Sequence, residues 1–358
     1  MSLWRWADML TPVPESARIT LGEGNTPLVK SRHIGPDVGL PNLHFKLEQG
    51  NPTGSYKDRF AAVAVSRLVA TGKTCCITTS SGNAGAALAA YCAAAGIECR
   101  VAVFEGAPAG KLTQMLAYGA SVARIRGFGT DPATTTTVFR RLKQLGKRPT
   151  AALQVSAFAF SPEAMSGIKT IAFELAEQLP QGMDHVFCPA GGGGLCAGTA
   201  QGFAQLQQRG TLVDAPRVEC VQPAGNDTIS SPLRAGELRA RRVAGTSRIS
   251  GLQVPVAVDG HLALTACRES GGTGHVVSDD DVWEAQRRLA RQEGIFTEPA
   301  GAVALAGLLK AIRDREIQPE ATIVCIVSGS GFKDADAINR MNQDVACPLM
   351  EPVELADW

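Results

Sequence analysis

The sequence predicts an α/β fold with two domains, each containing a mostly parallel sheet covered by helices. Short β-branched runs alternate with alanine-rich helical segments, and the turns between them are short, which is typical of parallel sheets. The alternation pauses at a loop, residues 157–163, and then resumes. The length of 358 residues corresponds to about two domains at ~150 residues each.

Apolar periodicity predicts the individual elements. In the first half we expect strands at residues 43–47, 74–79, 99–104 and 121–125, and helices at residues 59–71, 84–95, 111–118 and 132–145. In the second half we expect strands at residues 185–188, 218–221 and 322–327, and helices at residues 166–178, 278–292 and 300–312, with one more after residue 194. Residues 224–277 are rich in Gly, Arg and Ser and give no clear prediction.

Composition limits the partners and the compartment. The formal net charge is +1, so nothing favours a nucleic acid or an anionic membrane as partner. No apolar stretch approaches the ~20 residues of a spanning helix, and the N-terminus does not resemble a secretory signal. The ten cysteines form no C-x-x-C pair. We therefore expect buried free thiols, no metal site and a reducing cytoplasm.

Lys57 is the first candidate catalytic residue. It lies in Gly54-Ser55-Tyr56-Lys57-Asp58-Arg59, at the start of a predicted helix. A helix N-terminus favours anions, so an ammonium there is disfavoured, and a dry cleft would disfavour it further. The alternative is a solvated surface lysine. Loss of the proton would make Lys57 a nucleophilic amine that can form an imine.

Three further loops follow predicted strands, where ligands bind in open α/β sheets. Residues 79–85, Thr-Ser-Ser-Gly-Asn-Ala-Gly, open a helix and suit a carboxylate. Gly191, Gly192, Gly193 and Gly194 lose much conformational entropy on folding, which favours a close approach to phosphate. Ser328-Gly329-Ser330-Gly331 offers a hydroxyl to a ring nitrogen. Each loop alone could be an ordinary capped turn, but together they match a phosphorylated pyridine aldehyde.

Several motifs then resemble one family, the threonine synthase-like branch of the fold-type II (tryptophan synthase beta-like) pyridoxal-phosphate enzymes. The resemblance covers residues from about 20 to 340. The motifs that carry it are Leu21-Gly22-Glu23-Gly24-Asn25-Thr26-Pro27-Leu28, the segment from Asn51 to Arg59, Ser80-Ser81-Gly82-Asn83, Glu298-Pro299-Ala300-Gly301-Ala302, and the segment from Ser328 to Asp334.

The resemblance implies two three-layer αβα domains, a larger cofactor-binding domain of residues 1–53 plus 157–358 and a smaller substrate-loop domain of residues 54–156. It implies pyridoxal 5'-phosphate as cofactor, an amino-acid substrate and a homodimer. Lys57 would hold the cofactor as a Schiff base and move the α-proton. The other implied cofactor-binding residues are Asn83, Gly191, Gly192, Gly193, Gly194, Leu195 and Ser328. Ser80, Ser81 and Asn83 would bind the substrate.

The reaction stays open at this point. Threonine synthases usually have an arginine for the substrate's phosphate in the segment that corresponds to residues 161–169, and this chain has none there. Lys169 is a possible substitute. The expected activity is a β- or γ-elimination or replacement of the threonine synthase type, which converts O-phosphohomoserine to threonine and phosphate. The alternative is an ammonia-lyase like the threonine and serine dehydratases, which the glycine-rich loop favours.

Two alternatives from other classes are weaker. A nicotinamide dehydrogenase would explain the G-x-G-x-x-A pattern from Gly192 to Ala197. The next predicted strand ends in Gln222, however, where a ribose-binding acid would be expected. A non-catalytic binding module would not require Lys57.

Overall fold

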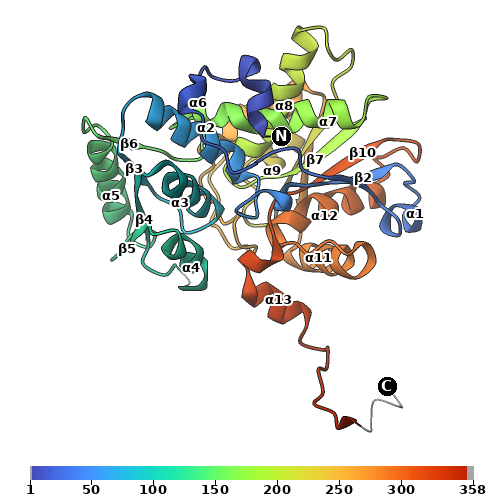
Figure 1. Cartoon of the computed structure of the whole chain (residues 1–358). Helices are drawn as coiled ribbons and strands as arrows, with labels where there is room; N and C mark the ends of the chain where they lie inside the picture. Colours follow the sequence, from blue (N-terminus) through green and yellow to red (C-terminus); the bar gives the residue numbers. More distant parts are fainter. Residues whose placement is uncertain (1, 108, 353–358) are drawn as a thin grey trace.

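The strands occupy two groups along the chain. The computed structural model describes residues 2–107 and 109–352 (Figure 1). The first group is β1 (Leu28–Lys30), β2 (Leu43–Leu47), β7 (His185–Pro189), β8 (Arg217–Pro223), β9 (Gly274–Val277) and β10 (Ile323–Val327). The second is β3 (Cys75–Thr78), β4 (Glu98–Phe104), β5 (Ser121–Ile125) and β6 (Ala151–Leu153).

Each group forms one sheet. The large sheet has the order β1-β2-β10-β7-β8-β9 and the small sheet β5-β4-β3-β6. Within the described residues all neighbouring strands are parallel except β1 and β2. The α/β class with mostly parallel sheets is therefore confirmed.

Helices cover both sheets. Those around the small sheet are α2 (Lys57–Ala70), α3 (Asn83–Ala95), α4 (Ala109–Ala117) and α5 (Pro132–Leu145). Those around the large sheet are α1 (Ile34–Asp37), α6 (Pro162–Met165), α7 (Thr170–Gln178), α8 (Gly194–Gln208), α9 (Ser230–Arg234), α10 (Gly260–Glu269), α11 (Asp279–Glu293) and α12 (Pro299–Arg313). The last helix within the described residues, α13 (Ala335–Met341), leads to residues 342–352, which extend from the body in Figure 1. No helix in the described ranges has the length and apolarity to cross a membrane.

Alternate residues of the strands enter different cores, as the two-residue period of a strand requires. In β10, Val324 and Ile326 pack with α7, α8 and α10, whereas Cys325 packs with α11 and α12. In β3, Cys76 enters the first of these cores and Ile77 enters a third one beneath α5. One core thus runs from the large sheet to the small one through α2. We propose that each sheet with its helices is a domain, with residues 54–156 forming the smaller one.

One predicted helix needs correction, and several elements were not predicted. The helix expected at residues 166–178 begins as a 3-10 turn, η4 (Ser166–Lys169), before α7. Here Gly167 lies so close to α2 that an added Cβ would be 2.0 Å from the Arg59 carbonyl oxygen. The uninterpreted stretch 224–277 contains α9, α10 and β9, and the short edge strands β1 and β6 were also missed.

A buried ionic network fixes α2 against α7 and the segment around the end of β2. The Arg59 guanidinium, fully buried, donates to Glu48 and Glu174 at 2.7 Å each. The Lys46 ammonium donates to Glu174 at 2.7 Å as well. Each charge is paired and hydrogen-bonded, as burial demands. Because Arg59 follows Lys57 by two residues, this network positions the start of α2.

Candidate functional site

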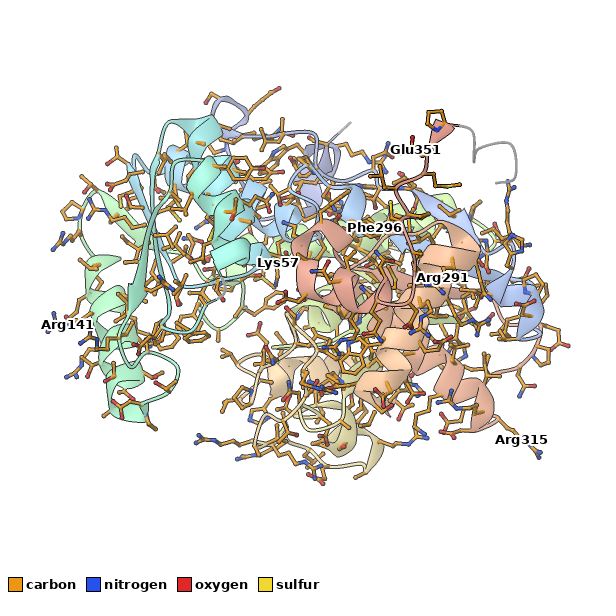
Figure 2. All side chains as sticks on the ribbon, turned by 90° about the horizontal axis from the view of Figure 1, so that it is seen from below. Lys57, Arg141, Arg291, Phe296, Arg315 and Glu351 are labelled. Carbon is orange, nitrogen blue, oxygen red and sulfur yellow. The ribbon has the colours of Figure 1, made fainter. Side chains whose placement is uncertain are left out.

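Lys57 is the first residue of α2, and its amine faces the loop after β6. Figure 2 shows it near the centre of the molecule, between the lobe that carries Arg141 and the lobe that carries Arg291. Its Nζ atom donates to the Ser156 hydroxyl at 2.8 Å and lies 4.5 Å from the centre of the Tyr56 ring. Burial lowers the pKa of Lys57 to about 8, and the negative charge of Asp259 opposes this shift. The neutral, nucleophilic amine is therefore much more populated near neutral pH than in an ordinary solvated lysine.

The segment before Lys57 is held by the loop after β10. The Tyr56 N–H donates to the Ser328 carbonyl oxygen at 3.1 Å, and the Ser330 N–H donates to the Gly54 carbonyl oxygen at 2.9 Å. Ser328 itself is buried. The structure therefore brings Ser328 beside Lys57, although the two residues are far apart in the sequence.

The glycine loop has the conformation of an anion cradle. Gly193 has a φ of +97° and caps α8, a helix of 15 residues whose first residue is Gly194. An added Cβ at Gly193 would lie 2.8 Å from the Ala263 Cβ, whereas one at Gly192 would meet nothing within 4 Å. The backbone N–H groups at the start of α8 thus border open space at the positive end of a helix, which is an arrangement that suits phosphate. Leu195, next in α8, is buried.

Asp259 connects this loop to Lys57. Its N–H donates to the Gly192 carbonyl oxygen at 3.1 Å. Its carboxylate accepts from the N–H groups of Phe158 and Ala159 at 2.7 and 3.0 Å. These two residues follow Ser156, so Asp259 fixes the loop whose hydroxyl receives the Lys57 amine.

The predicted substrate loop lies between β3 and α3. Asn83 is the first residue of α3, and its Nδ2 donates to Glu298 Oε1 at 2.7 Å. Ser80 and Ser81 are half-buried in the same loop. An added Cβ on Gly329 would lie 2.1 Å from Glu298 Oε1 and 3.2 Å from Asn83 Nδ2. The start of α3 therefore contacts the loop after β10 at this point.

Sequence reasoning missed three of the polar groups at this site. Glu298 begins the motif Glu298-Pro299-Ala300-Gly301-Ala302, but a glutamate side chain by itself indicated no specific role. Asp259 and Ser156 gave no signal, because each lies in a segment without regular periodicity. Lys169, the possible phosphate ligand, has its Nζ donating to Gln205 Oε1 at 3.3 Å. Gln205 lies 11 residues along α8 from Gly194, about 16 Å at 1.5 Å per residue, so Lys169 lies away from the site.

The donor set fits a phosphorylated pyridine aldehyde. Lys57 supplies an amine with a lowered pKa, and the start of α8 supplies an anion cradle with room at Gly192. Ser328 supplies a neutral hydroxyl close to Lys57. The same groups would offer little to a nicotinamide nucleotide, which does not need an amine.

Comparisons with known proteins support this interpretation. Residues 19–329 match the model of the family described as "Pyridoxal-phosphate dependent enzyme". Threonine synthase of Methanocaldococcus jannaschii is 35% identical over 350 residues, covering 96% of this chain and 84% of that protein. Among solved structures, a processed threonine deaminase of Solanum lycopersicum superposes with a TM-score of 0.75 at 22% identity, covering 96% of this chain and 88% of that one.

A second solved structure, a threonine deaminase from T.th., has a TM-score of 0.69 at 28% identity and covers 86% of this chain and 92% of its own. The family match spans most of the chain and includes Lys57, the glycine loop and Ser328. The chain belongs to the pyridoxal-phosphate-dependent enzymes of fold type II.

Proposed function

We propose that this protein is a pyridoxal-phosphate-dependent lyase that acts on an amino acid by β- or γ-elimination or replacement, in the manner of threonine synthases. The observation that carries the proposal is the Lys57 amine, whose pKa is lowered to about 8, beside Ser156 and the Ser328 loop. The similarity to proteins named threonine synthase over nearly the whole chain supports the same reaction type.

Each residue has a defined task in this proposal. Lys57 holds the cofactor and moves a proton at the substrate's α-carbon. The backbone N–H groups from Gly191 to Leu195 bind the cofactor's phosphate. Ser328 donates to the ring nitrogen, and Asn83, fixed by Glu298, orients the ring's phenolic oxygen. When bound, the cofactor withdraws electrons from the α-carbon.

The substrate's carboxylate is assigned to Ser80, Ser81 and Asn83 at the start of α3, where the helix N-terminus favours an anion. We also assign the glycine loop to the cofactor. Its G-x-G-x-x-A pattern therefore gives no support to a nicotinamide dehydrogenase.

A second candidate reaction is the ammonia-lyase type, deamination of threonine or serine. One observation favours it: residues 161–169 contain no arginine, and Lys169 is bound to Gln205 away from the site. A substrate phosphate would thus lack a bidentate cation from this segment. The structural similarity to a threonine deaminase at 28% identity agrees with this alternative.

One pair of assays separates the reactions. The holoenzyme is given O-phosphohomoserine, and phosphate release is measured; in parallel it is given threonine and serine, and keto-acid formation is measured. Phosphate release in excess of keto-acid formation supports the synthase reaction, and the reverse supports the ammonia-lyase. Turnover that persists in Lys57→Ala would contradict both.

The assembly and location belong to the same proposal. We propose a homodimer, as the family resemblance implies, in a reducing cytoplasm, as the free cysteines favour. Light scattering on the purified holoenzyme measures the mass directly, and a monomer at micromolar concentration would contradict the dimer.

A further inference from the structure

Three cysteine thiols meet in the core of the small domain, away from the proposed active site. Cys76 lies on β3, Cys92 on α3 and Cys99 on β4. Their sulfur atoms all lie within 4.8 Å of one another, and all three side chains are buried. Their sequence spacing did not reveal this group, because three separate elements contribute one thiol each.

The fold fixes this arrangement. Cys76 and Cys99 are partners across the parallel strands β3 and β4, so both project from the same face of the sheet. Helix α3 packs over that face and adds Cys92. The neighbouring Cys75 projects to the opposite face, where it packs beneath α5. A one-residue shift of register would therefore destroy the cluster.

The geometry suits a three-coordinate ion. A metal–thiolate bond of about 2.3 Å places the sulfurs of a trigonal site about 4 Å apart. Small rotations of the three side chains would close the observed separations to this value. Soft thiolates select thiophilic ions over the hard, oxygen-preferring ones.

The surroundings determine the charge of the ion. The three thiols lie among apolar side chains of the core that includes Val101 and Leu88. A buried net charge without a partner is costly. Three thiolates would remain anionic around a monovalent or divalent ion, but they form a neutral complex with a trivalent one.

Access also distinguishes the three thiols. Cys99 is the least buried of them, at 5% exposure against 0% for the other two, so it is the thiol that an ion from solvent would meet first.

We propose that Cys76, Cys92 and Cys99 form a binding site for a trivalent thiophilic ion of the arsenite class. Binding breaks three S–H and three As–OH bonds and forms three As–S bonds and three water molecules. Arsenic stays trivalent, so the step needs no oxidant or reductant. The ion joins β3 to α3, the two elements that flank the loop of Ser80 and Asn83.

The mass of the adduct tests the proposal without cofactor or substrate. The reduced full-length protein is incubated with sodium arsenite, desalted and measured by native mass spectrometry. We expect one arsenic per chain with the loss of three hydrogens. No adduct, or an adduct that keeps a hydroxyl and loses two hydrogens, would overturn a three-thiol site.

Matched variants locate the ion. Cys92→Ala places alanine in an alanine-rich helix, where it is well tolerated, and it should abolish the three-hydrogen adduct. Cys267→Ala removes an equally buried thiol from α10 in the large domain and should keep it. Loss in the second variant with retention in the first would refute the assignment. If Cys92→Ala does not fold, Cys99→Ala decides, since it removes a thiol of the same group from β4 and should likewise abolish the three-hydrogen adduct.

Discussion

The Nζ atom of Lys57 lies 2.8 Å from the Oγ atom of Ser156, which belongs to the loop after β6. The hydroxyl belongs to a loop that the Asp259 carboxylate fixes through two backbone N–H groups. Asp259, the residue before α10, therefore helps to orient the amine through the loop of Ser156.

The titration of Lys57 is the first prediction. In the cofactor-free protein we expect a pKa near 8 rather than the ordinary value of about 10.4, because burial disfavours the ammonium. Asp259→Asn should lower it further, since the carboxylate favours the charged form. Reductive ¹³C-methylation with NMR titration, assigned through Lys57→Arg, measures both values. A wild-type pKa above 10 would contradict the proposed burial effect.

Removal of the amine should abolish catalysis while the fold survives. Lys57→Ala should lose at least about 10³-fold in turnover, because nucleophilic and acid–base roles are lost together. It should also fail to retain coloured cofactor after borohydride treatment. Lys147→Ala, which removes an exposed lysine just after α5, is the control and should behave as the wild type. Equal labelling of both variants would rule out Lys57 as the attachment site.

A substitution in the glycine loop should separate an effect on cofactor binding from an effect on folding. Gly192→Ala should leave the stability of the cofactor-free protein unchanged, because the new Cβ would meet nothing within 4 Å. It should weaken cofactor affinity about tenfold or more, because the methyl group enters the space proposed for phosphate. Gly106→Ala, also without neighbours within 4 Å, is the control. Unchanged affinity in Gly192→Ala would place the phosphate elsewhere.

Loss of the hydrogen bond between Asn83 and Glu298 should lower turnover more than it lowers stability. Glu298→Ala removes the acceptor at 2.7 Å from Asn83 Nδ2, and hydrogen bonds to charged groups contribute about 1.5–3 kcal/mol. We expect kcat to fall about tenfold or more, with partial recovery in Glu298→Gln, which keeps an acceptor oxygen. Steady-state kinetics on the preferred substrate measure both. A change confined to the melting temperature would indicate a structural role alone.

The buried network around Arg59 should dominate stability. Arg59→Met leaves Glu48 and Glu174 buried without their main partner, which costs about 3–5 kcal/mol. Arg100→Met removes a surface pair with Glu98 and should leave the unfolding midpoint unchanged. Urea denaturation compares the two. A similar midpoint for both variants would show that Arg59 is not central.

The sequence was informative where local pattern determines structure. Period-two and helical spacing predicted β2, β5 and α5 at their observed bounds. The edge strands β1 and β6 have three residues each, too few for a period to be recognised. Their pairing depends on neighbours distant in the chain, so no local signal could reveal them.

The residues of the candidate site also fall into those that the sequence revealed and those that it did not. Lys57, Gly193 and Ser328 were identified as candidates because each lies in a motif with a chemical reason for its residue types. Asp259 was missed because its partners, Phe158 and Ala159, lie about 100 residues away and offer only backbone groups. Side-chain-to-backbone contacts of this range leave no trace in composition or periodicity.

The position of β10 has a consequence for synthesis of the chain. This strand comes from residues 323–327 yet lies between β2 and β7 in the middle of the large sheet. During synthesis, about nine-tenths of the polypeptide must emerge from the ribosome before β10 can pair with β2. Until then, β2 keeps one edge without a hydrogen-bonding partner. Premature termination shortly before residue 323 should therefore produce aggregates rather than a trimmed enzyme.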